Sequence, residues 1–445
     1  MEFKNKKIHF IGIKGAGMAG LAKLFKAEGA IVSGSDIGEE FFTDEILKKL
    51  GLKVEEFNVK NISKNLDLVI YSTAYQPSHP EIKKAGKLKI PLMSYSQALG
   101  FLFNQKIGIA VCGTHGKSTS AGMLGKIFKD AGLNPTVLVG GEILNWKTGA
   151  LAGRGKYFIS EADEYQAKFL SLKPKAILIT NIEYDHPDYF KNFTAYKNVF
   201  KKLVKNIKPG GLCVGFGEDK AIKEVLKNFK SKKILFSPKK QKKIFEKIKL
   251  QIPGEHNRVN ALGVFLTAKQ FGISEKAILK SLKSFKGMRR RLEYKNNPSA
   301  VRQLAERSKF LIIDDYAHHP TEIKASLLAL RETFSERKII AAFQPHTFSR
   351  TKVFLKDFGS AFFEADKVLI LDIYGSAREK KGKISSRDLV KKLEKNKIDV
   401  HYTPSIFECR RFFKNIIKVN RNKPQKYILL TMGAGDVWKA GENLI

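Results

Sequence analysis

Short apolar runs alternate with helical patterns along most of the chain. Runs rich in Ile, Val, Leu and Phe predict buried strands at 7–13, 30–34, 66–71, 107–112, 157–160, 176–180, 310–313, 339–343, 367–371 and 427–431. Apolar residues also recur at helical spacing, as in Met18, Leu21, Ala22 and Phe25 after the first run. Strands that alternate with helices are typical of parallel sheets, so the pattern predicts an α/β protein.

The run at 107–112 leads into a glycine turn and then into another helical pattern. The turn consists of Gly113, Thr114, His115, Gly116, Lys117, Ser118 and Thr119. Such a turn can bind phosphate, because glycines let backbone N–H groups approach the oxygens and a helix N-terminus carries partial positive charge. Lys117 would reach the β- and γ-phosphates of a nucleotide, and the Ser118 hydroxyl would hold Mg²⁺. The complete phosphate-loop pattern has glycine where this chain has Val111, and an ordinary strand-to-helix turn is the simpler alternative.

A different glycine pattern follows the first strand. The pattern G-x-G-x-x-G is formed by Gly15, Ala16, Gly17, Met18, Ala19 and Gly20. An acidic residue, Asp36, comes just after the second strand and about 20 residues after the first glycine, as in dinucleotide-binding folds. The pattern favours an NAD-dependent oxidoreductase. However, the turn recognises a diphosphate and the acid a ribose, and a UDP-sugar carries both groups. Both ligands remain open at this point.

Polar residues come directly after two strands of the region from 107 onwards. Glu161, Asp163 and Glu164 follow the run at 157–160, and the stretch from Asn181 to His186 follows the run at 176–180. The carboxyl ends of parallel strands meet at the edge of a sheet where ligands bind. Carboxylates suit Mg²⁺, with His186 as a further ligand or a supporting group. Each residue alone fits an ordinary polar surface, but together with the Lys-Ser turn they favour a metal–nucleotide site.

The second half of the chain offers further candidates. Asn257 and Asn260 are three residues apart and would share a helix face, with helix capping the alternative for Asn257. Arg291 ends a run of three arginines that could stabilise a transferring phosphoryl group. Polar sets also follow the strands at 310–313 and 339–343, and they contain Asp315, Tyr316, His318, His346 and Arg350. A zinc site is not expected, because adjacent histidine side chains diverge and no third soft ligand lies at a fixed spacing.

Composition sets limits on these hypotheses. A chain of 445 residues is too long for one core and should divide into two to four domains. Three widely spaced cysteines argue against a disulfide framework, and no apolar run approaches the roughly 20 residues that a membrane helix needs. We therefore expect a cytoplasmic chain. The formal net charge of +38 would suit nucleic acid, but lysines are spread over nearly every predicted helix and are dense only at 229–249.

Taken in their order along the chain, these residues resemble the motifs of the Mur ligases, ATP-dependent amino-acid ligases of peptidoglycan synthesis. The resemblance covers nearly the whole chain and depends on the stretches 15–18, 113–117, 161–164, 181–186, 253–257, 314–320, 343–346 and 377–380. It implies three domains, each with a mostly parallel sheet. They are a Rossmann-like UDP-sugar-binding domain at 1–106, a P-loop ATPase-like domain at 107–287, and a Rossmann-like amino-acid-binding domain at 288–445.

Within the family, the motifs are most similar to the branch that joins L-alanine to the carboxylate of UDP-N-acetylmuramate through an acyl phosphate, with ATP and Mg²⁺. The stretch 343–346 favours this branch over the one that attaches a tripeptide to the same sugar nucleotide. Outside the family, an NAD-dependent oxidoreductase and a nucleic-acid-binding protein remain the alternatives. The resemblance leaves open whether the chain is a monomer or a homodimer.

The resemblance also implies roles for individual residues. The phosphates and metal would be held by Lys117, Ser118, Glu161 and His186, and the γ-phosphate also by Arg291. Adenine or ribose would be bound by Asn257, Asn260 and Asp315. The amino acid and the acyl phosphate would face Tyr316, His318, His346 and Arg350. The UDP group would be bound by Gly15, Gly17, Asp36, Ser72 and Thr73, the last two after the third strand.

The charge leads to a first prediction. If +38 reflects a general lysine bias, duplex DNA should bind weakly and should be released at physiological salt, because counterion release makes phosphate contacts steeply salt-dependent. Neutralising the lysines of 239–243 should weaken this DNA binding and leave ligase activity unchanged, as measured by filter binding and phosphate release. Loss of ligase activity in a folded variant would instead place this cluster in the active site.

Overall fold

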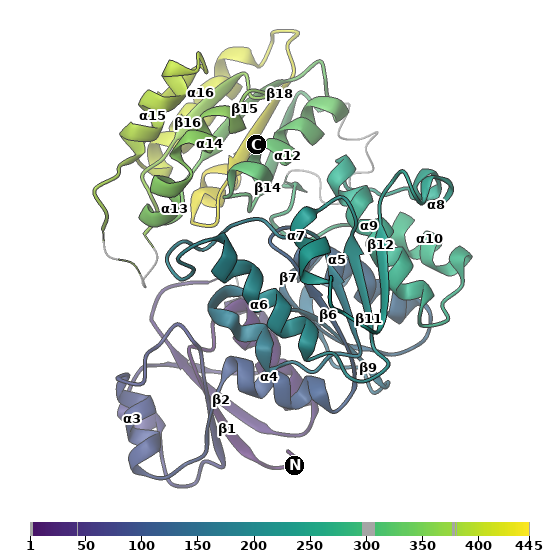
Figure 1. Cartoon of the computed structure of the whole chain (residues 1–445). Helices are drawn as coiled ribbons and strands as arrows, with labels where there is room; N and C mark the ends of the chain where they lie inside the picture. Colours follow the sequence, from purple (N-terminus) through teal and green to yellow (C-terminus); the bar gives the residue numbers. More distant parts are fainter. Residues whose placement is uncertain (1–2, 42, 296–307, 376–378, 380, 445) are drawn as a thin grey trace. The chain divides into compact units, whose positions relative to one another are not determined.

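The structure is a computed structural model that describes residues 3–41, 43–295, 308–375, 379 and 381–444. Strands and helices alternate along the chain and build three sheets, each flanked by helices (Figure 1). The chain divides into two compact units. The first comprises 1–183, 197–247 and 260–282, and the second comprises 184–196, 248–259 and 283–445. No helix among the described residues is long and apolar enough to cross a membrane.

The first sheet has five parallel strands in the order β3-β2-β1-β4-β5. The strands are β1 Lys7–Ile11, β2 Ile31–Asp36, β3 Val54–Glu56, β4 Leu68–Tyr71 and β5 Leu92–Ser94. The helices are α1 Ala16–Ala27, α2 Asp44–Lys49, η1 Val59–Asn61, α3 Pro80–Lys87 and α4 Tyr95–Asn104. The strand order reverses between β1 and β4, which is where such sheets bind ligands. Strands β3 and β5 were not predicted, because three-residue strands give no periodic signal.

The second sheet belongs to the same unit and has seven strands in the order β12-β11-β10-β6-β9-β7-β8. The strands are β6 Ile107–Cys112, β7 Thr136–Ile143, β8 Thr148–Leu151, β9 Tyr157–Glu161, β10 Ala176–Ile179, β11 Leu212–Phe216 and β12 Lys232–Phe236. The helices are α5 Lys117–Asp130, η2 Tyr165–Ser171, α6 Phe193–Lys205, α7 Lys220–Val225, α8 Lys242–Lys247, α9 Glu255–Lys269 and α10 Glu275–Lys283. Only β8 runs antiparallel to its neighbour. Because β6 lies between β10 and β9, the loops after these three strands emerge side by side.

Helix α1 of the first sheet packs on the hairpin formed by β7 and β8 of the second. A Cβ atom at Gly20 would lie 2.5 Å from Cδ1 of Leu138 and 3.5 Å from Cβ of Ala150. The ammonium of Lys23 also donates a hydrogen bond to Oγ1 of Thr148 at 3.3 Å. The third glycine of the G-x-G-x-x-G pattern therefore allows close packing of helix and strand, as it does in dinucleotide-binding folds. Here, however, the strand belongs to the neighbouring sheet.

The second unit is built on a sheet of six strands in the order β13-β14-β18-β15-β16-β17. The strands are β13 Glu293–Tyr294, β14 Phe310–Asp315, β15 Lys338–Phe343, β16 Lys367–Ile370, β17 Val400–Tyr402 and β18 Tyr427–Met432. The helices are α12 Pro320–Thr333, α13 Phe348–Val353, α14 Leu355–Ala361, α15 Ser386–Lys395, α16 Ile406–Asn420 and η3 Val437–Gly441. Alternate residues of β14, β15 and β18 fill two separate apolar cores, one containing Leu327 and Phe358, the other Cys409 and Phe413. Only β13 is antiparallel.

The predicted α/β class with three mostly parallel sheets is confirmed. The domain boundaries at 106/107 and 287/288 remain predictions. Helix α9 begins at Glu255, so Asn257 lies inside the helix, and the capping alternative for this residue is wrong. Of the predicted motif at 377–380, only Glu379 lies within the described residues.

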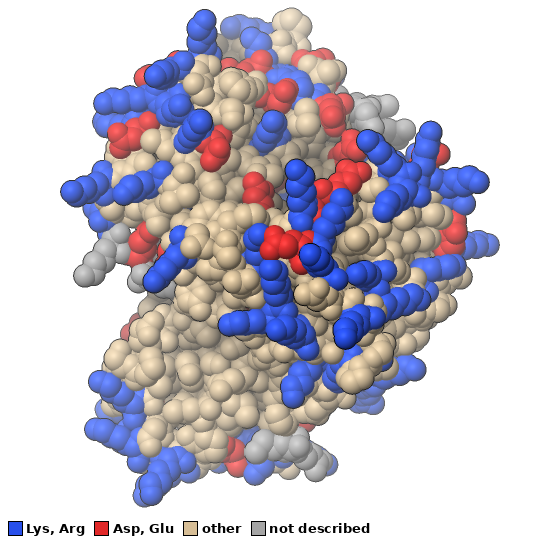
Figure 2. All heavy atoms as spheres, viewed as in Figure 1, with Lys and Arg blue, Asp and Glu red and all other residues tan. Residues whose placement is uncertain are grey.

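The cysteines and the lysines also follow the expectations from composition. Cys112, Cys213 and Cys409 are free thiols and fully buried. Lysine and arginine side chains are spread over the visible face of both units, with acidic groups among them (Figure 2). The lysines of 239–243 are exposed just before and in the first turn of α8. The charge therefore does not gather in a single patch on this face.

Candidate active site

The turn after β6 has a backbone that only glycine adopts readily. Gly113 and Gly116 have φ angles of +135° and +77°, and Gly116 directly precedes α5. A Cβ atom at Gly113 would lie 2.1 Å from Oγ1 of Thr180, and one at Gly116 would lie 2.4 Å from Nδ2 of Asn260. Both positions therefore exclude a side chain. The second contact also places Asn260 beside the turn.

The end of β10 fixes this turn in place. The backbone N–H of Thr114 donates to the carbonyl of Asn181 at 3.0 Å, and that of His115 donates to the Asn181 side chain at 2.8 Å. The hydroxyl of Thr180 donates to the carbonyl of His115 at 2.6 Å. With these groups occupied, the N–H groups in the first turn of α5 remain oriented for an anion, because helix N-termini lack intrahelical acceptors.

Lys117 lies across the turn. Its ammonium donates to the carbonyls of Gly113 and Thr114 at 2.8 and 2.9 Å and forms an ion pair with the fully buried Glu164 at 3.0 Å. Burial alone would lower the pKa of Lys117, but the carboxylates of Glu164, Asp163 and Glu161 raise it above its ordinary value. Lys117 is therefore a fixed cation. From the sequence, Glu164 was one of several carboxylates after a strand that could suit Mg²⁺, and its pairing with Lys117 was not predicted.

Ser118 and Glu161 meet as predicted. The Ser118 hydroxyl donates to one carboxylate oxygen of Glu161 at 2.8 Å, and the backbone N–H of Gly140 in β7 donates to the other at 2.7 Å. A hydroxyl and a carboxylate at the N-terminus of α5 are oxygen donors of the kind that Mg²⁺ prefers. The residues present therefore fit a magnesium ion next to a nucleotide.

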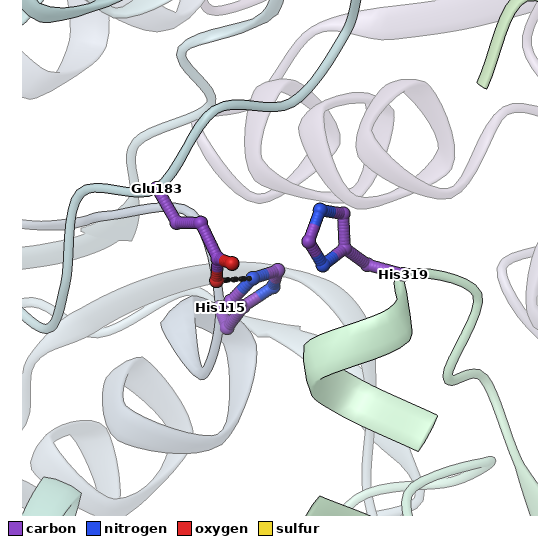
Figure 3. A group of neighbouring side chains, drawn as sticks. All are labelled: His115, Glu183 and His319. Atoms are coloured by element: carbon purple, nitrogen blue, oxygen red, sulfur yellow. Dashed lines mark hydrogen bonds and ion pairs between the residues drawn. The ribbon is translucent and has the colours of Figure 1, made fainter. Parts of the chain in front are cut away.

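A second interaction connects the turn with the loop after β10. Nε2 of His115 lies 3.0 Å from a carboxylate oxygen of Glu183, as the dashed line in Figure 3 shows. The Thr114 hydroxyl donates to the backbone carbonyl of Glu183 at 2.8 Å. Figure 3 also draws His319, which belongs to the second unit.

The G-x-G turn of the first sheet lies at its switch point. A Cβ atom at Gly12, where φ is +79°, would lie 2.6 Å from the ring of Tyr75 and 2.9 Å from Cβ of Ser72. The loops after β1 and β4 thus touch, which brings Ser72 and Thr73 to the turn formed by 12–15. Asp36 is buried and accepts hydrogen bonds from the Lys14 N–H at 2.7 Å and the Tyr75 hydroxyl at 3.3 Å. In this structure Asp36 holds the turn in position.

The remaining residues of this turn differ in exposure. Gly15 is exposed and Ala16 and Gly17 are half-buried, whereas Met18 points into the apolar core. The first turn of α1 is therefore accessible to an anionic ligand, and Met18 contributes packing.

In the second unit a buried ion pair fixes one end of the candidate site. Arg350 donates from Nε and Nη2 to a carboxylate oxygen of Asp185 at 3.0 and 2.9 Å. Burial would raise the pKa of Asp185, but Arg350 and the nearby histidines hold it well below its usual range. The same carboxylate oxygen accepts the N–H of His186, which has a φ of +55°. Asp185 thus orients both Arg350 and the backbone of a predicted metal ligand.

The histidines of this unit gather around Arg350. Nδ1 of His346 lies 3.1 Å from Nη1 of Arg350, and the ring centroids of His346 and His318 are 6.0 Å apart. Burial lowers the pKa of both imidazoles, that of His318 to about 4 despite the nearby Glu322. Both rings are therefore neutral at pH 7, and Arg350 carries the positive charge.

Arg291, Tyr316 and Asp315 complete this group. The guanidinium of Arg291 lies over the Tyr316 ring, 5.0 Å from its centroid, and 3.8 Å from a Glu322 oxygen. Asp315 is buried and accepts bonds from the Ala317 N–H at 2.8 Å and the Ser326 hydroxyl at 2.9 Å. Burial raises the pKa of Asp315 to about 6. Its oxygens thus stabilise the loop before α12.

The predicted metal ligands and the two predicted asparagines are divided between the two units. His186 belongs to the second unit, whereas Ser118 and Glu161 belong to the first. Asn257 also belongs to the second unit, where its amide donates to the carbonyl of Pro253 at 2.6 Å. The structure therefore brings together the phosphate turn with Glu161 and Asn260 in one unit, and Arg291, Asp315, Tyr316, His318, His346 and Arg350 in the other.

Models of known protein families match three successive parts of the chain. Residues 7–107 match the Mur ligase family, catalytic domain; 111–268 match the Mur ligase middle domain; and 297–435 match the Mur ligase, glutamate ligase domain. The chain belongs to the Mur ligase family, whose members are ATP-dependent. This excludes the oxidoreductase that the first glycine turn alone suggested.

Particular relatives have a more specific name. The UDP-N-acetylmuramate–L-alanine ligase of Desulfitobacterium hafniense strain Y51 is 36% identical over 98% of this chain and 99% of its own. The enzyme of that name from Clostridium acetobutylicum is 38% identical over 98% of this chain and 97% of its own. The crystal structure of UDP-N-acetylmuramate–alanine ligase from Thermotoga maritima matches with a TM-score of 0.78, at 26% identity and 98% coverage of both chains.

The position of Lys117 leads to a prediction. Replacing Lys117 with alanine should lower ATP turnover by at least about 10²-fold, because the turn loses its fixed cation. Affinity for a UDP-sugar should remain nearly unchanged, since the G-x-G turn is a separate site. Lys129→Ala is the matched control, because Lys129 is exposed on the same helix. A comparable loss of UDP-sugar affinity in folded Lys117→Ala would show that the two sites had been confused.

The Asp185–Arg350 pair leads to a prediction about stability. Asp185→Asn should destabilise the second unit by about 3–5 kcal/mol at pH 7, because Arg350 would remain buried without its counter-charge. Denaturant unfolding can be followed by Trp438 fluorescence in a Trp146→Phe background. The control Asp399→Asn breaks a partly exposed pair with Lys367 and should cost at most about 1 kcal/mol. Equal effects of the two substitutions would contradict a special role of the buried pair.

The stability that the Asp185–Arg350 pair contributes depends on pH in a defined direction. The folded-state pKa of Asp185 lies below its unfolded value of about 4. Its contribution to stability is therefore present above pH 4 and is lost only as the pH falls through the lower, folded pKa.

Proposed function

We propose that this Mur ligase joins L-alanine to the carboxylate of UDP-N-acetylmuramate and converts ATP to ADP and phosphate, as a step of peptidoglycan precursor synthesis. The observation that carries the proposal is the full-length similarity to relatives of that name, at 36–38% identity over 98% of the chain. The two glycine turns support it independently, because the reaction needs one site for a nucleoside triphosphate and another for a nucleotide sugar. ATP and nucleotide sugars are cytoplasmic metabolites, so we place the reaction in the cytoplasm.

The first step brings two anions together. The carboxylate of the sugar nucleotide attacks the γ-phosphorus of ATP, the bond to the β-phosphate oxygen breaks, and an acyl phosphate and ADP form. Lys117 and the first-turn amides of α5 would hold the triphosphate and offset the repulsion between the anions. Ser118 and Glu161 would hold Mg²⁺, with His186 as a further ligand. When bound, Mg²⁺ supplies charge neutralisation at the transferring phosphoryl group.

The second step forms the amide bond. The amine of L-alanine attacks the acyl carbon, phosphate leaves, and the amine gives up a proton. Arg350 would hold the carboxylate of alanine or the acyl phosphate, and its orientation by Asp185 supports this role. His318 and His346 would contribute neutral hydrogen-bonding groups, because both are uncharged at pH 7. Tyr316 would line the same site, Arg291 would reach the γ-phosphate, and Asn257, Asn260 and Asp315 would surround the nucleoside.

The proposal is tested by leaving out one component at a time. We expect phosphate release only when UDP-N-acetylmuramate, L-alanine, ATP and Mg²⁺ are all present. Glycine, L-serine and a tripeptide replace L-alanine in parallel reactions to test the choice of amine. NAD⁺ binding with hydride transfer and no ATP turnover would refute a ligase, and turnover with the tripeptide but not with L-alanine would place the chain in the other branch.

A further inference from the structure

Tyr95 occupies a position that neither the motifs nor the comparisons assign to any function. It is the first residue of α4 and follows directly on β5, so it emerges at the same edge of the first sheet as the G-x-G turn. A Cβ atom at Gly17 would lie 2.8 Å from the Tyr95 hydroxyl oxygen, 2.9 Å from Cζ and 3.0 Å from Cε2. The end of the phenol ring therefore lies directly over the second glycine of the turn.

Helix α4, which begins with Tyr95, also contacts the second sheet's part of the unit. Helix α4 packs on η2, which follows the stretch containing Glu161 and Asp163. A Cβ atom at Gly100 would lie 2.7 Å from the carbonyl oxygen of Ser171, and the Asn104 side chain donates to that oxygen at 3.0 Å. Burial raises the pKa of Tyr95, and the charges of Asp163 and Glu161 raise it further. Tyr95 therefore lies in the same unit as the proposed metal-binding carboxylate, and its phenol is protonated at pH 7.

The hydroxyl is also available to a ligand. Tyr95 is only partly buried, and its hydroxyl makes no hydrogen bond to any other residue in the described part of the chain. A phenol in a protein usually finds a hydrogen-bond partner for its hydroxyl, and this hydroxyl lies against the glycine turn with its donor unused among the described residues. A hydrogen-bond donor therefore lies over the turn proposed to bind the diphosphate, in the unit that also carries the carboxylate proposed to bind Mg²⁺.

A nucleotide sugar has to bridge these two places. Its diphosphate would bind at the first turn of α1, and its reacting carboxylate has to reach the γ-phosphate beside Ser118 and Glu161. We propose that Tyr95 donates a hydrogen bond to the acidic sugar of the bound nucleotide, beyond the diphosphate, and so positions the reacting carboxylate. This inference depends on the proposed ligase activity.

The substitution Tyr95→Phe removes only the hydroxyl. A hydrogen bond to a charged or strongly polar acceptor is worth about 1.5–3 kcal/mol, which is about tenfold or more in affinity. We expect the Kd of UDP-N-acetylmuramate, measured by calorimetry without ATP, to rise about tenfold, and kcat/KM to fall by a similar factor. The Kd of UDP should change less than twofold, because UDP lacks the N-acetylmuramate group to which Tyr95 would donate.

The matched control is Tyr157→Phe in the same unit, where Tyr157 is buried and its ring lies 5.1 Å from that of Phe128. It should leave both dissociation constants unchanged. A purely structural role of Tyr95 predicts an altered melting temperature or an equal loss for both ligands, and either result would overturn the inference. So would unchanged affinity for the sugar nucleotide. Absence of turnover by the unmodified protein with all substrates would instead refute the ligase function itself.

Discussion

The site depends on the backbone of one turn, held at φ angles that side chains rarely adopt. Gly113 and Gly116 are confined by Thr180 and Asn260, so the turn cannot relax without displacing two other elements. The carbonyl of Asn181 accepts a hydrogen bond from the N–H of Thr114, and its side chain accepts one from the N–H of His115. As a consequence, β10 and β6 must keep their register for the first turn of α5 to point at a phosphate. The parallel pairing of these strands is therefore a functional constraint as well as a structural one.

Two buried ion pairs, one in each unit, each fix the position of a cationic side chain. Both Lys117–Glu164 and Asp185–Arg350 are largely withdrawn from water, which is costly for each ion separately. Within each pair the partner offsets this cost and also sets the direction of the cation. Neutral histidines beside Arg350 complete one site, and an oxygen-rich metal position completes the other. Charge neutralisation and hydrogen bonding are thus assigned to different side chains: Lys117 and Arg350 carry the charge, and the neutral histidines offer hydrogen bonds.

Much of this arrangement could be predicted from the sequence, because strands with apolar runs and their polar ends are local signals. Parallel strands placed Ser118 and Glu161 at one sheet edge, whereas the grouping of His318, His346 and Arg350 came from the family resemblance. Contacts between different sheets give no such local signal in the sequence. Gly20 was part of a recognised pattern, but its packing against Leu138 depends on tertiary structure. Tyr95 gave no signal because it follows a strand of only three residues, and the hydrogen bonds by which Asp36 holds the turn are also tertiary.

Cys112 ends the strand that leads into the phosphate turn, and its thiol is completely buried. Burial, together with the nearby Cys213 and Glu164, raises its pKa well above the usual value. The thiol can therefore react with an alkylating reagent only when β6 separates from its neighbours. Its rate of modification reports how often the sheet opens at the base of the nucleotide site. A bound nucleotide that contacts both the turn and the first residues of α5 would slow this opening. Alkylation of Cys112 is therefore a chemical probe of local unfolding at the nucleotide site.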